Sequence, residues 1–293
     1  MNIALTVLQT VAPVFLLAFV GFAWVKAGFE FRLEFVTRLS MTLSVPCLIF
    51  VALMRSKADP SALSALTLAS FAAYAVLTLV FWVILKLARL DRATYLAPLI
   101  YGNTGNLGLP IATFAFGETG LSYAVVVFAV MAVLSFTVGI WLVAGRGSLL
   151  RVVREPMVGA TILGALFAWQ GWQTPVWLTN SLQLTGQMAI PLMLITLGVA
   201  VARLHPAGFV RPLILSLVKA AVCAATAFFV GRAFGLPHTA LAVLILQVGT
   251  PVAVTSYLLA EKYGADGAAV AGLTVVSTLL SIAIIPLMLA LLM

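Results

Sequence analysis

The fold is decided by the stretch Gly102-Asn-Thr-Gly-Asn-Leu-Gly-Leu-Pro110, which lies inside an apolar segment long enough to cross a membrane. A helix that spans a bilayer satisfies its backbone N–H and C=O groups internally. Glycine and proline interrupt such a helix, and asparagine amides are costly in lipid. An opened backbone is tolerated only where protein or a water-filled cavity covers it. The stretch therefore predicts a broken helix at a binding site.

The composition of the whole chain is that of a membrane protein. Hydrophobic residues make up 63% of the 293 residues and charged residues only 8%, against about 25% in average proteins. The apolar runs are continuous and about 20 residues long, which favours spanning helices over an outer-membrane barrel. We expect an all-α polytopic protein with ten spans, at roughly 4–25, 36–54, 62–86, 94–116, 121–144, 157–172, 176–202, 211–232, 238–260 and 266–292.

The basic residues are distributed unequally between the two sides of these spans. Of the 16 lysines and arginines, 12 fall in loops after odd-numbered spans, three fall on the opposite side and Lys219 falls within a span. Basic loops mark the cytoplasmic side, so both termini are expected to face outward and the loop at 145–156 inward. Membrane topology thus accounts for the net charge of +8 without nucleic-acid binding. The first 20 residues lack Lys and Arg, which predicts a retained span rather than a cleaved signal peptide.

Similar features recur in the two halves of the chain. Pro46 and Pro191 are 145 residues apart, and Leu96-Ala-x-Leu-Ile100 recurs at the same separation as Leu241-Ala-x-Leu-Ile245. The interrupted fourth span has a counterpart in the ninth, Gln247-Val-Gly-Thr-Pro251. Five spans in each half would insert in opposite orientations, which is the inverted-repeat plan of many secondary transporters.

The first interrupted stretch has the side chains of an anion site. A helix broken inside the membrane leaves a half-helix N-terminus with free N–H donors and about half a positive charge, where an anion can bind. Asn103 and Asn106 can donate to a carboxylate or accept from a cation, and Gly105 and Gly108 let a ligand approach the backbone. The alternative is a helix kinked at Pro110 whose asparagines bind neighbouring helices.

The second interrupted stretch supplies a candidate partner for the first. We expect Gln247, Thr250 and Pro251 to share a crossing point with it, although a proline kink alone is common in spanning helices. Ser44 and Gln187 lie near the two matched prolines and can face the crossing. Structural kinking without ligand contact is the alternative for these two residues.

Few other residues carry chemistry. Lys219 either reaches the cytoplasmic interface or contacts a helix, or it attracts the anion. Glu118 and Asp266 read as loop or cap residues, so no carboxylate is expected at mid-membrane. Cys47 and Cys223 read as small apolar residues within spans. There is no phosphate loop, zinc-protease motif or metal-spaced cluster, so we expect no catalytic residue, metal or cofactor.

The two interrupted stretches resemble those of a known family. Asn103-Thr-Gly-Asn-Leu-Gly-Leu-Pro110, followed by Phe116-Gly-Glu118, resembles the fourth-span motif of the auxin efflux carrier family. Gln247–Pro251, followed by Ala260-Glu-Lys-Tyr263, resembles the ninth span. That family includes bacterial malonate-transporter-like proteins and plant PIN-type auxin carriers.

The resemblance implies ten helices in a five-plus-five inverted repeat, similar to bile-acid and sodium/proton transporters. Broken helices four and nine would cross beside a carboxylate, with Asn103, Asn106 and Pro110 at the first crossing and Gln247 and Pro251 at the second. Scaffold helices would lie in two segments and transport-domain helices in the two others. These segments are 1–60 (scaffold), 61–145 (transport), 146–205 (scaffold) and 206–293 (transport).

We therefore expect a secondary transporter of a small organic anion, a mono- or dicarboxylate, in the bacterial inner membrane. A transport domain would move against the scaffold to alternate access. A sodium- or proton-coupled carrier or exchanger on the same fold is one alternative, and a membrane-embedded sensor is another. The expected partners are the substrate and the bilayer, with a coupling ion and a homodimer left open.

Overall fold

The structure is a computed structural model that describes residues 3–56, 58–144, 156–204 and 208–292. Lys57, His205 and most of the loop at 145–156 lie outside these ranges. The described chain is helical, and its one β-type pairing is an isolated antiparallel bridge. The helices before the loop are α1 (Ile3–Lys26), α2 (Leu33–Leu39), η1 (Ser40–Ser44), α3 (Val45–Met54), α4 (Pro60–Leu87), α5 (Arg92–Ile100), η2 (Thr104–Gly108), α6 (Leu109–Leu134), η3 (Ser135–Gly139) and α7 (Ile140–Ala144). Those after it are α9 (Pro156–Gln170), α10 (Val176–Gln187), α11 (Ala189–Arg203), α12 (Val210–Ala233), α13 (His238–Val248), α14 (Val254–Tyr263) and α15 (Gly267–Leu292); the three η segments are π-helical turns.

Seven helical runs of the described chain are long and apolar enough to cross a membrane. Two shorter apolar helices, α9 and α13, lie where the sixth and ninth spans are expected. One of the seven runs, Thr104–Val143, has 40 residues and is kinked at Gly117, where φ is 62° and ψ is −149°. This kink falls between the expected fourth and fifth spans. Length and hydropathy alone therefore establish a multi-pass membrane protein and leave the count of ten as a prediction.

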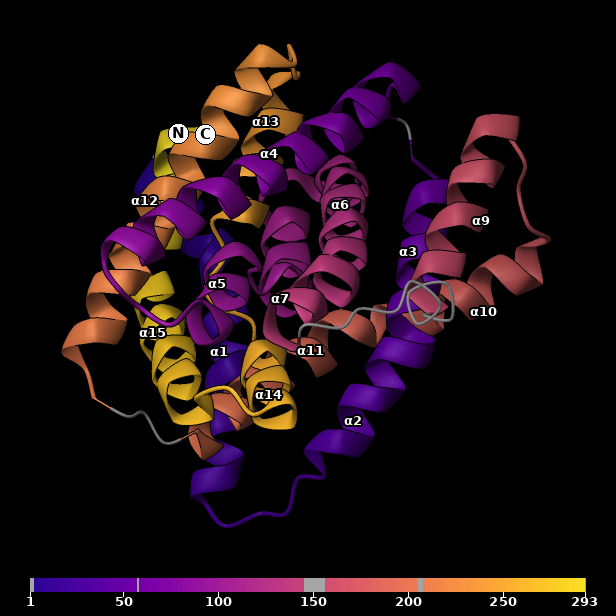
Figure 1. The fold of residues 1–293 in the computed structure, drawn as a ribbon. Coiled ribbons are helices and arrows are strands. Elements are labelled where there is room, and N and C mark those ends of the chain that lie inside the picture. The colour runs from indigo at the N-terminus through magenta and orange to yellow at the C-terminus, as the bar shows by residue number, and fades with distance from the viewer. Residues whose placement is uncertain (1–2, 57, 145–155, 205–207, 293) are drawn as a thin grey trace.

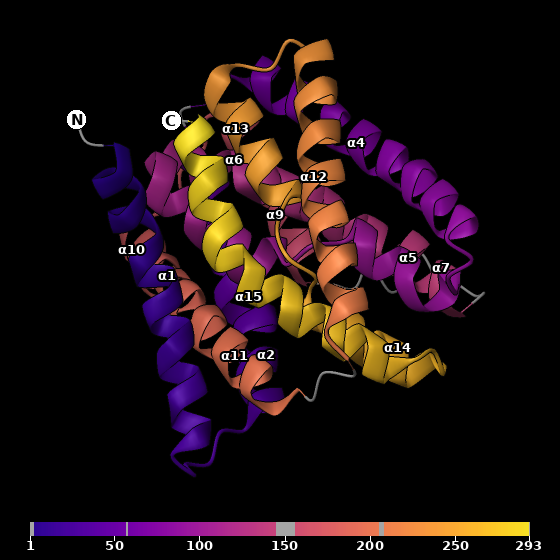
Figure 2. The ribbon, with the colours of Figure 1, turned by 90° about the vertical axis from the view of Figure 1, so that its left-hand side faces the viewer.

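The helices gather into two groups (Figures 1 and 2). In one group α1 packs along α11, and α3 packs against α9 and α10. Glycines allow the close approach of α1 and α11, since a Cβ on Gly21 would overlap the Ile195 carbonyl and one on Gly198 would overlap that of Ala18. Small residues at such contacts are typical of helix pairs in membranes.

The second group contains α4 to α7 and α12 to α15. Within it α12 packs against α13, α15 and α4, and α13 packs against α6. Contacts of α1 with α6 and α15, and of α3 with α6, join this group to the first. The start of α1 and the end of α15 lie at the same end of the molecule (Figures 1 and 2).

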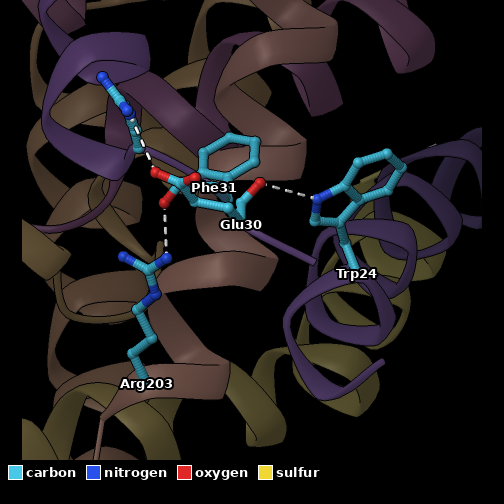
Figure 3. A network of polar contacts seen from close by, with 5 residues as sticks. Trp24, Glu30, Phe31 and Arg203 are labelled. Atoms are coloured by element: carbon cyan, nitrogen blue, oxygen red, sulfur yellow. Dashed lines mark hydrogen bonds and ion pairs between the residues drawn. The ribbon is translucent and has the colours of Figure 1, made fainter. Parts of the chain in front are cut away.

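A small polar network ties the α1–α2 loop to the end of α11 (Figure 3). Arg203 donates from Nη2 to the Phe31 carbonyl at 2.5 Å, and the Trp24 indole donates to the Glu30 carbonyl at 3.2 Å. The Glu30–Arg32 ion pair is exposed and contributes little to stability. The loop is therefore held mainly by its backbone carbonyls.

Aspartates begin three of the helices in the second group. Asp59 accepts from the Ser61 N–H at the start of α4, and Asp91 accepts from the backbone N–H and hydroxyl of Thr94 at the start of α5. These are N-cap bonds, which satisfy donors that the first turn leaves open. The hydrogen bond from the Thr94 side chain holds the pKa of Asp91 below its ordinary value. Asp266 caps α15 in the same way through the Ala269 N–H, as expected for a cap residue.

We predict that Asp91→Ala destabilises the protein by about 1 kcal/mol, because it removes the cap of α5. Asp91→Asn keeps the acceptor and should be close to wild type. Since folding lowers the pKa of Asp91, its contribution is complete above about pH 4 and is lost as the pH falls through the folded-state value. Thermal unfolding in detergent between neutral and acidic pH measures both effects. Equal acid sensitivity of the wild type and the Asn variant would contradict the assignment.

Candidate functional site

The first helix break lies where the sequence places it. Helix α5 ends at Ile100, Tyr101 is extended, and after Gly102 and Asn103 the π-turn η2 leads into α6. Pro110 lies in the first turn of α6, directly after the π-turn, where its ring removes one backbone N–H donor from the helical run. The interrupted stretch is thus a helix end followed directly by a helix start.

The second break has the same form. Helix α13 ends at Val248 and α14 begins at Val254, with Gly249–Ala253 between them. Thr250 donates from its hydroxyl to the Gln247 carbonyl at 2.7 Å, which occupies one of the carbonyls at the end of α13. The predicted partner stretch is therefore interrupted at the predicted residues.

The two breaks meet and pair with each other. Gly102 and Val252 form the isolated antiparallel bridge, and the Asn103 N–H donates to the Pro251 carbonyl at 2.7 Å. The Val252 N–H donates to Ser277 Oγ on α15 at 3.1 Å. Protein thus covers both openings, as the bilayer requires of irregular backbone.

Two glycines make this contact possible. A Cβ on Gly102 would overlap Thr250, including its backbone oxygen, and a Cβ on Gly108 would overlap the side-chain amide of Gln247. Gly105 faces the ring of Phe128, and a Cβ there would lie 3.1 Å from that ring. In the structure these glycines leave room for protein groups at the crossing. From the sequence, Gly105 and Gly108 were expected to leave room for a ligand.

Three polar atoms at the crossing are buried without a partner among the described residues. They are Asn103 Nδ2, Thr104 Oγ1 and Gln247 Oε1. The other amide atom of Gln247, Nε2, donates to the Ala124 carbonyl at 3.4 Å. Buried polar groups are normally hydrogen-bonded, and an exception points to a missing ligand or water. The crossing therefore offers donors and an acceptor to a small polar molecule.

The C-terminal and N-terminal helix ends at the crossing differ in whether side chains cap them. At the C-terminal ends, Thr250 occupies the Gln247 carbonyl of α13, and Lys219 Nζ donates to the Leu99 carbonyl of α5 at 2.9 Å. The N-terminal ends, at η2 and α14, have no side-chain cap, and in α14 the Ser256 N–H donates to the Ala253 carbonyl at 3.0 Å, while the N–H groups before it have no intrahelical acceptor. The positive ends of the half-helices are thus the open ones, which favours an anion.

Lys219 is the functional group whose position the sequence left undecided. Its side chain is 2% exposed and reaches a helix end inside the protein, so of the alternatives it makes a helix contact and does not extend to the interface. Thr104 and Ser277 were not predicted as site residues. Thr104 lay within the flagged stretch, whereas no sequence signal connects Ser277 with the break.

The remaining predicted residues lie around the crossing or away from it. Asn106 is partly buried on η2, and Ser44 is buried at the end of η1 with an unpartnered hydroxyl. Gln187 is exposed and lines a cavity of about 320 Å³ between α3, α6 and the α10–α11 junction. Glu118 lines the same cavity just after the Gly117 kink. No described hydrogen bond joins Ser44 or Gln187 to either break.

A larger cavity lies at the start of α5 and the end of α14, the half-helix ends that are farther from the crossing. It measures about 490 Å³ and contains Arg89, Asp91 and Arg211 together with the α14–α15 connection. None of the paired break residues lines it. It is therefore a separate polar surface from the crossing.

Comparison with known proteins identifies the family. The model of a family described as "Membrane transport protein" matches residues 6–151 and 142–289. The chain belongs to this membrane transport protein family. The predicted resemblance to auxin efflux carriers and malonate-transporter-like proteins is confirmed.

Two related proteins match part of the chain at lower coverage than the family model. An uncharacterized transporter of Methanocaldococcus jannaschii is 29% identical over 197 residues, which is 64% of each chain. A protein of Rhizobium meliloti named "Putative malonate transporter" is 26% identical over 201 residues, which is 62% of each chain. In both cases the match spans slightly less than two thirds of the relative.

We predict that Gly102→Ala destabilises this transporter by about 1–3 kcal/mol, because the new methyl group forces the paired backbones apart. Gly159→Ala in α9 is the matched control, since a Cβ there meets nothing within 4 Å. That control should be neutral or stabilising by up to about 1 kcal/mol. Thermal unfolding of the two purified variants measures the difference, and equal stability would contradict the close pairing.

Proposed function

We propose that the protein is a secondary transporter that moves a small organic anion, a mono- or dicarboxylate, by alternating access. The observation that carries this proposal is the pairing of two helix breaks around buried, unpartnered polar atoms. Asn103 Nδ2 and the first turn of η2 supply donors to a carboxylate, and Gln247 lies against Gly108 on the other side of the crossing. The name of the Rhizobium relative supports a carboxylate.

The proposed architecture has ten spans in a five-plus-five inverted repeat. The kink at Gly117 supports a division of the 40-residue run into spans four and five, and the paired breaks support spans four and nine as crossing helices. The group containing α1–α3 and α9–α11 would form the scaffold. The group containing α4–α7 and α12–α15 would carry the crossing as the transport domain. The placement of both chain ends at one end of the molecule suits an even number of spans.

The proposed setting is the bacterial inner membrane with both termini outside. The charge distribution supports this orientation through the positive-inside rule. Loops rich in Lys and Arg then face the cytoplasm, and the α1–α2 loop with Arg203 is among them. Alternating access would expose the crossing first to one side and then to the other.

A coupled carrier on the same fold is the second candidate. Gln247 Oε1 is a buried acceptor without a described partner, so it can receive a proton donor or a sodium ion beside the anion. Flux measured in proteoliposomes with and without sodium and pH gradients separates coupled transport from uniport.

We predict that Asn103→Ala and Gln247→Ala each abolish carboxylate transport while leaving folded protein in the membrane. Each variant removes a side-chain amide from one half of the crossing, so both halves are tested. Asn180→Ala is the matched control, because Asn180 is exposed on α10. Radiolabelled malonate uptake into proteoliposomes gives the transport rate, and thermal stability with and without malonate gives binding, since a bound ligand raises apparent stability.

The expected pattern is loss of uptake and of the malonate-induced stabilisation in both crossing variants, with the control unchanged. Wild-type uptake by Asn103→Ala and Gln247→Ala would remove the crossing as the binding site. Absence of binding and uptake in the wild type, across malonate, pyruvate and larger carboxylates, would contradict the proposed substrate class.

A further inference from the structure

A buried lysine, Lys219, contacts the helix end that leads into the first break. Lys219 lies roughly 14 Å along α12 from its first residue, Val210, and its side chain is among the most deeply buried in the described chain. Its Nζ donates to the Leu99 carbonyl at 2.9 Å, three residues before Gly102, and lies 4.0 Å from Cys223 Sγ. The lysine therefore contacts the end of the half-helix that forms the first break.

This environment suits a neutral amine better than a permanent ammonium. An ammonium has three N–H donors and carries a charge that is costly to bury without a counter-ion. Lys219 has one oxygen acceptor, and no carboxylate pairs with it among the residues that the structure describes. A neutral amine, in contrast, carries no charge, and one of its two N–H groups is satisfied by the Leu99 oxygen.

The groups on the helices around Lys219 offer no negative counter-ion within the part of the chain that the structure describes. On α12 itself the neighbour is Cys223, and α4 contributes Tyr74, whose buried hydroxyl has no partner in the described chain. Helix α5 has Arg92 and Tyr95 in its first turns, and the ring of Tyr101 packs on that of Tyr74. Helix α13 has only the exposed His238 at its start, and α15 has no ionisable side chain.

We propose that Lys219 binds the proton that accompanies the substrate through the membrane. This inference rests on the proposed function and makes it specific. On loading, the amine takes one proton from the side where the anion enters, and the resulting ammonium compensates the charge of a carboxylate at the adjacent half-helix end. On release, the anion leaves and the ammonium returns the proton on the other side.

Charge compensation explains why the two events are linked. A net charge inside the bilayer costs several kcal/mol or more, so a moving domain is least hindered when it is neutral. The loaded form, with ammonium and carboxylate, and the empty form, with amine and no anion, both meet this condition. One lysine compensates one negative charge, so the favoured substrate is a monocarboxylate or a dicarboxylate in its singly charged form.

In the proposed repeat, the position equivalent to Lys219 holds a neutral residue. Tyr74 precedes Lys219 by 145 residues, the same separation as Pro46 and Pro191. In the proposed repeat the two positions on α4 and α12 are equivalent, and of the two residues only Lys219, which donates to the Leu99 carbonyl, carries an amine. The proposed protonation site is therefore present in one of the two repeats.

The decisive measurement is the number of protons taken up when the purified wild-type protein binds pyruvate or malonate. Calorimetry in two buffers of different ionisation enthalpy, between about pH 6 and 9, gives this number directly. We expect an uptake that approaches one proton per bound pyruvate at the alkaline end and none for Lys219→Arg, whose guanidinium stays charged. Lys262→Met is the control, because that lysine is exposed on α14, where it lies over the ring of Tyr263.

Transport by the variants gives a second readout that a purely structural lysine would not move. In proteoliposomes Lys219→Arg should exchange labelled for unlabelled pyruvate but lose net uptake, since its empty form keeps a charge and cannot return. Lys219→Met should lose stimulation by a pH gradient. Thermal stability of each variant shows whether it is folded.

Pyruvate binding by the wild type without proton uptake at any pH overturns the role of Lys219, whether or not the variants fold. Proton-coupled net uptake by folded Lys219→Arg overturns it as well, as does a folded arginine variant that has lost exchange together with net uptake. A wild-type protein that binds no carboxylate contradicts the proposed function instead, so the two failures are distinguishable.

Discussion

The structure depends on the rule that backbone polar groups inside a bilayer must be satisfied within the protein. Two helices are interrupted inside the protein, and the backbone opened by each interruption pairs with the other. The Asn103 N–H reaches the Pro251 carbonyl, and the bridge between Gly102 and Val252 aligns the two chains. Gly102 and Gly108 allow the two segments to approach closely. The crossing has a paired backbone and buried polar side chains at its centre, although apolar helices surround it.

The polarity of this centre follows from which helix ends are already occupied. Thr250 and Lys219 bind carbonyls at the C-terminal ends of α13 and α5, while the N-terminal ends keep open donors. The same lysine links the two proposals, since it holds the α5 end and is a buried amine next to the proposed anion site. Charge selection and proton coupling would then come from a single side chain. A carboxylate inside the membrane would need neither a metal ion nor an exposed arginine.

The sequence predicted the two breaks because their cause is local. Glycine, asparagine and proline at 102–110 cannot continue a helix, and the matched proline at 251 indicated the partner. The long-range contacts were not predictable in this way. Lys219 meets Leu99 across 120 residues, and Ser277 meets Val252 from another helix, so neither pair leaves a local pattern. Ser44 and Gln187 were chosen for their distance in sequence from prolines, and that distance says little about where a side chain points. The family assignment was predictable because it rests on the same local motifs.

The central claim is that a carboxylate binds where the two helix breaks meet. A cryo-electron microscopy structure of the protein with malonate tests this most directly. We expect density for one carboxylate within about 2.7–3.2 Å of Asn103 Nδ2 or the first-turn N–H groups of η2, on the side of the crossing that Gln247 faces. Malonate in the cavity that contains Arg89 and Arg211, with the crossing empty, would show that the carboxylate binds elsewhere.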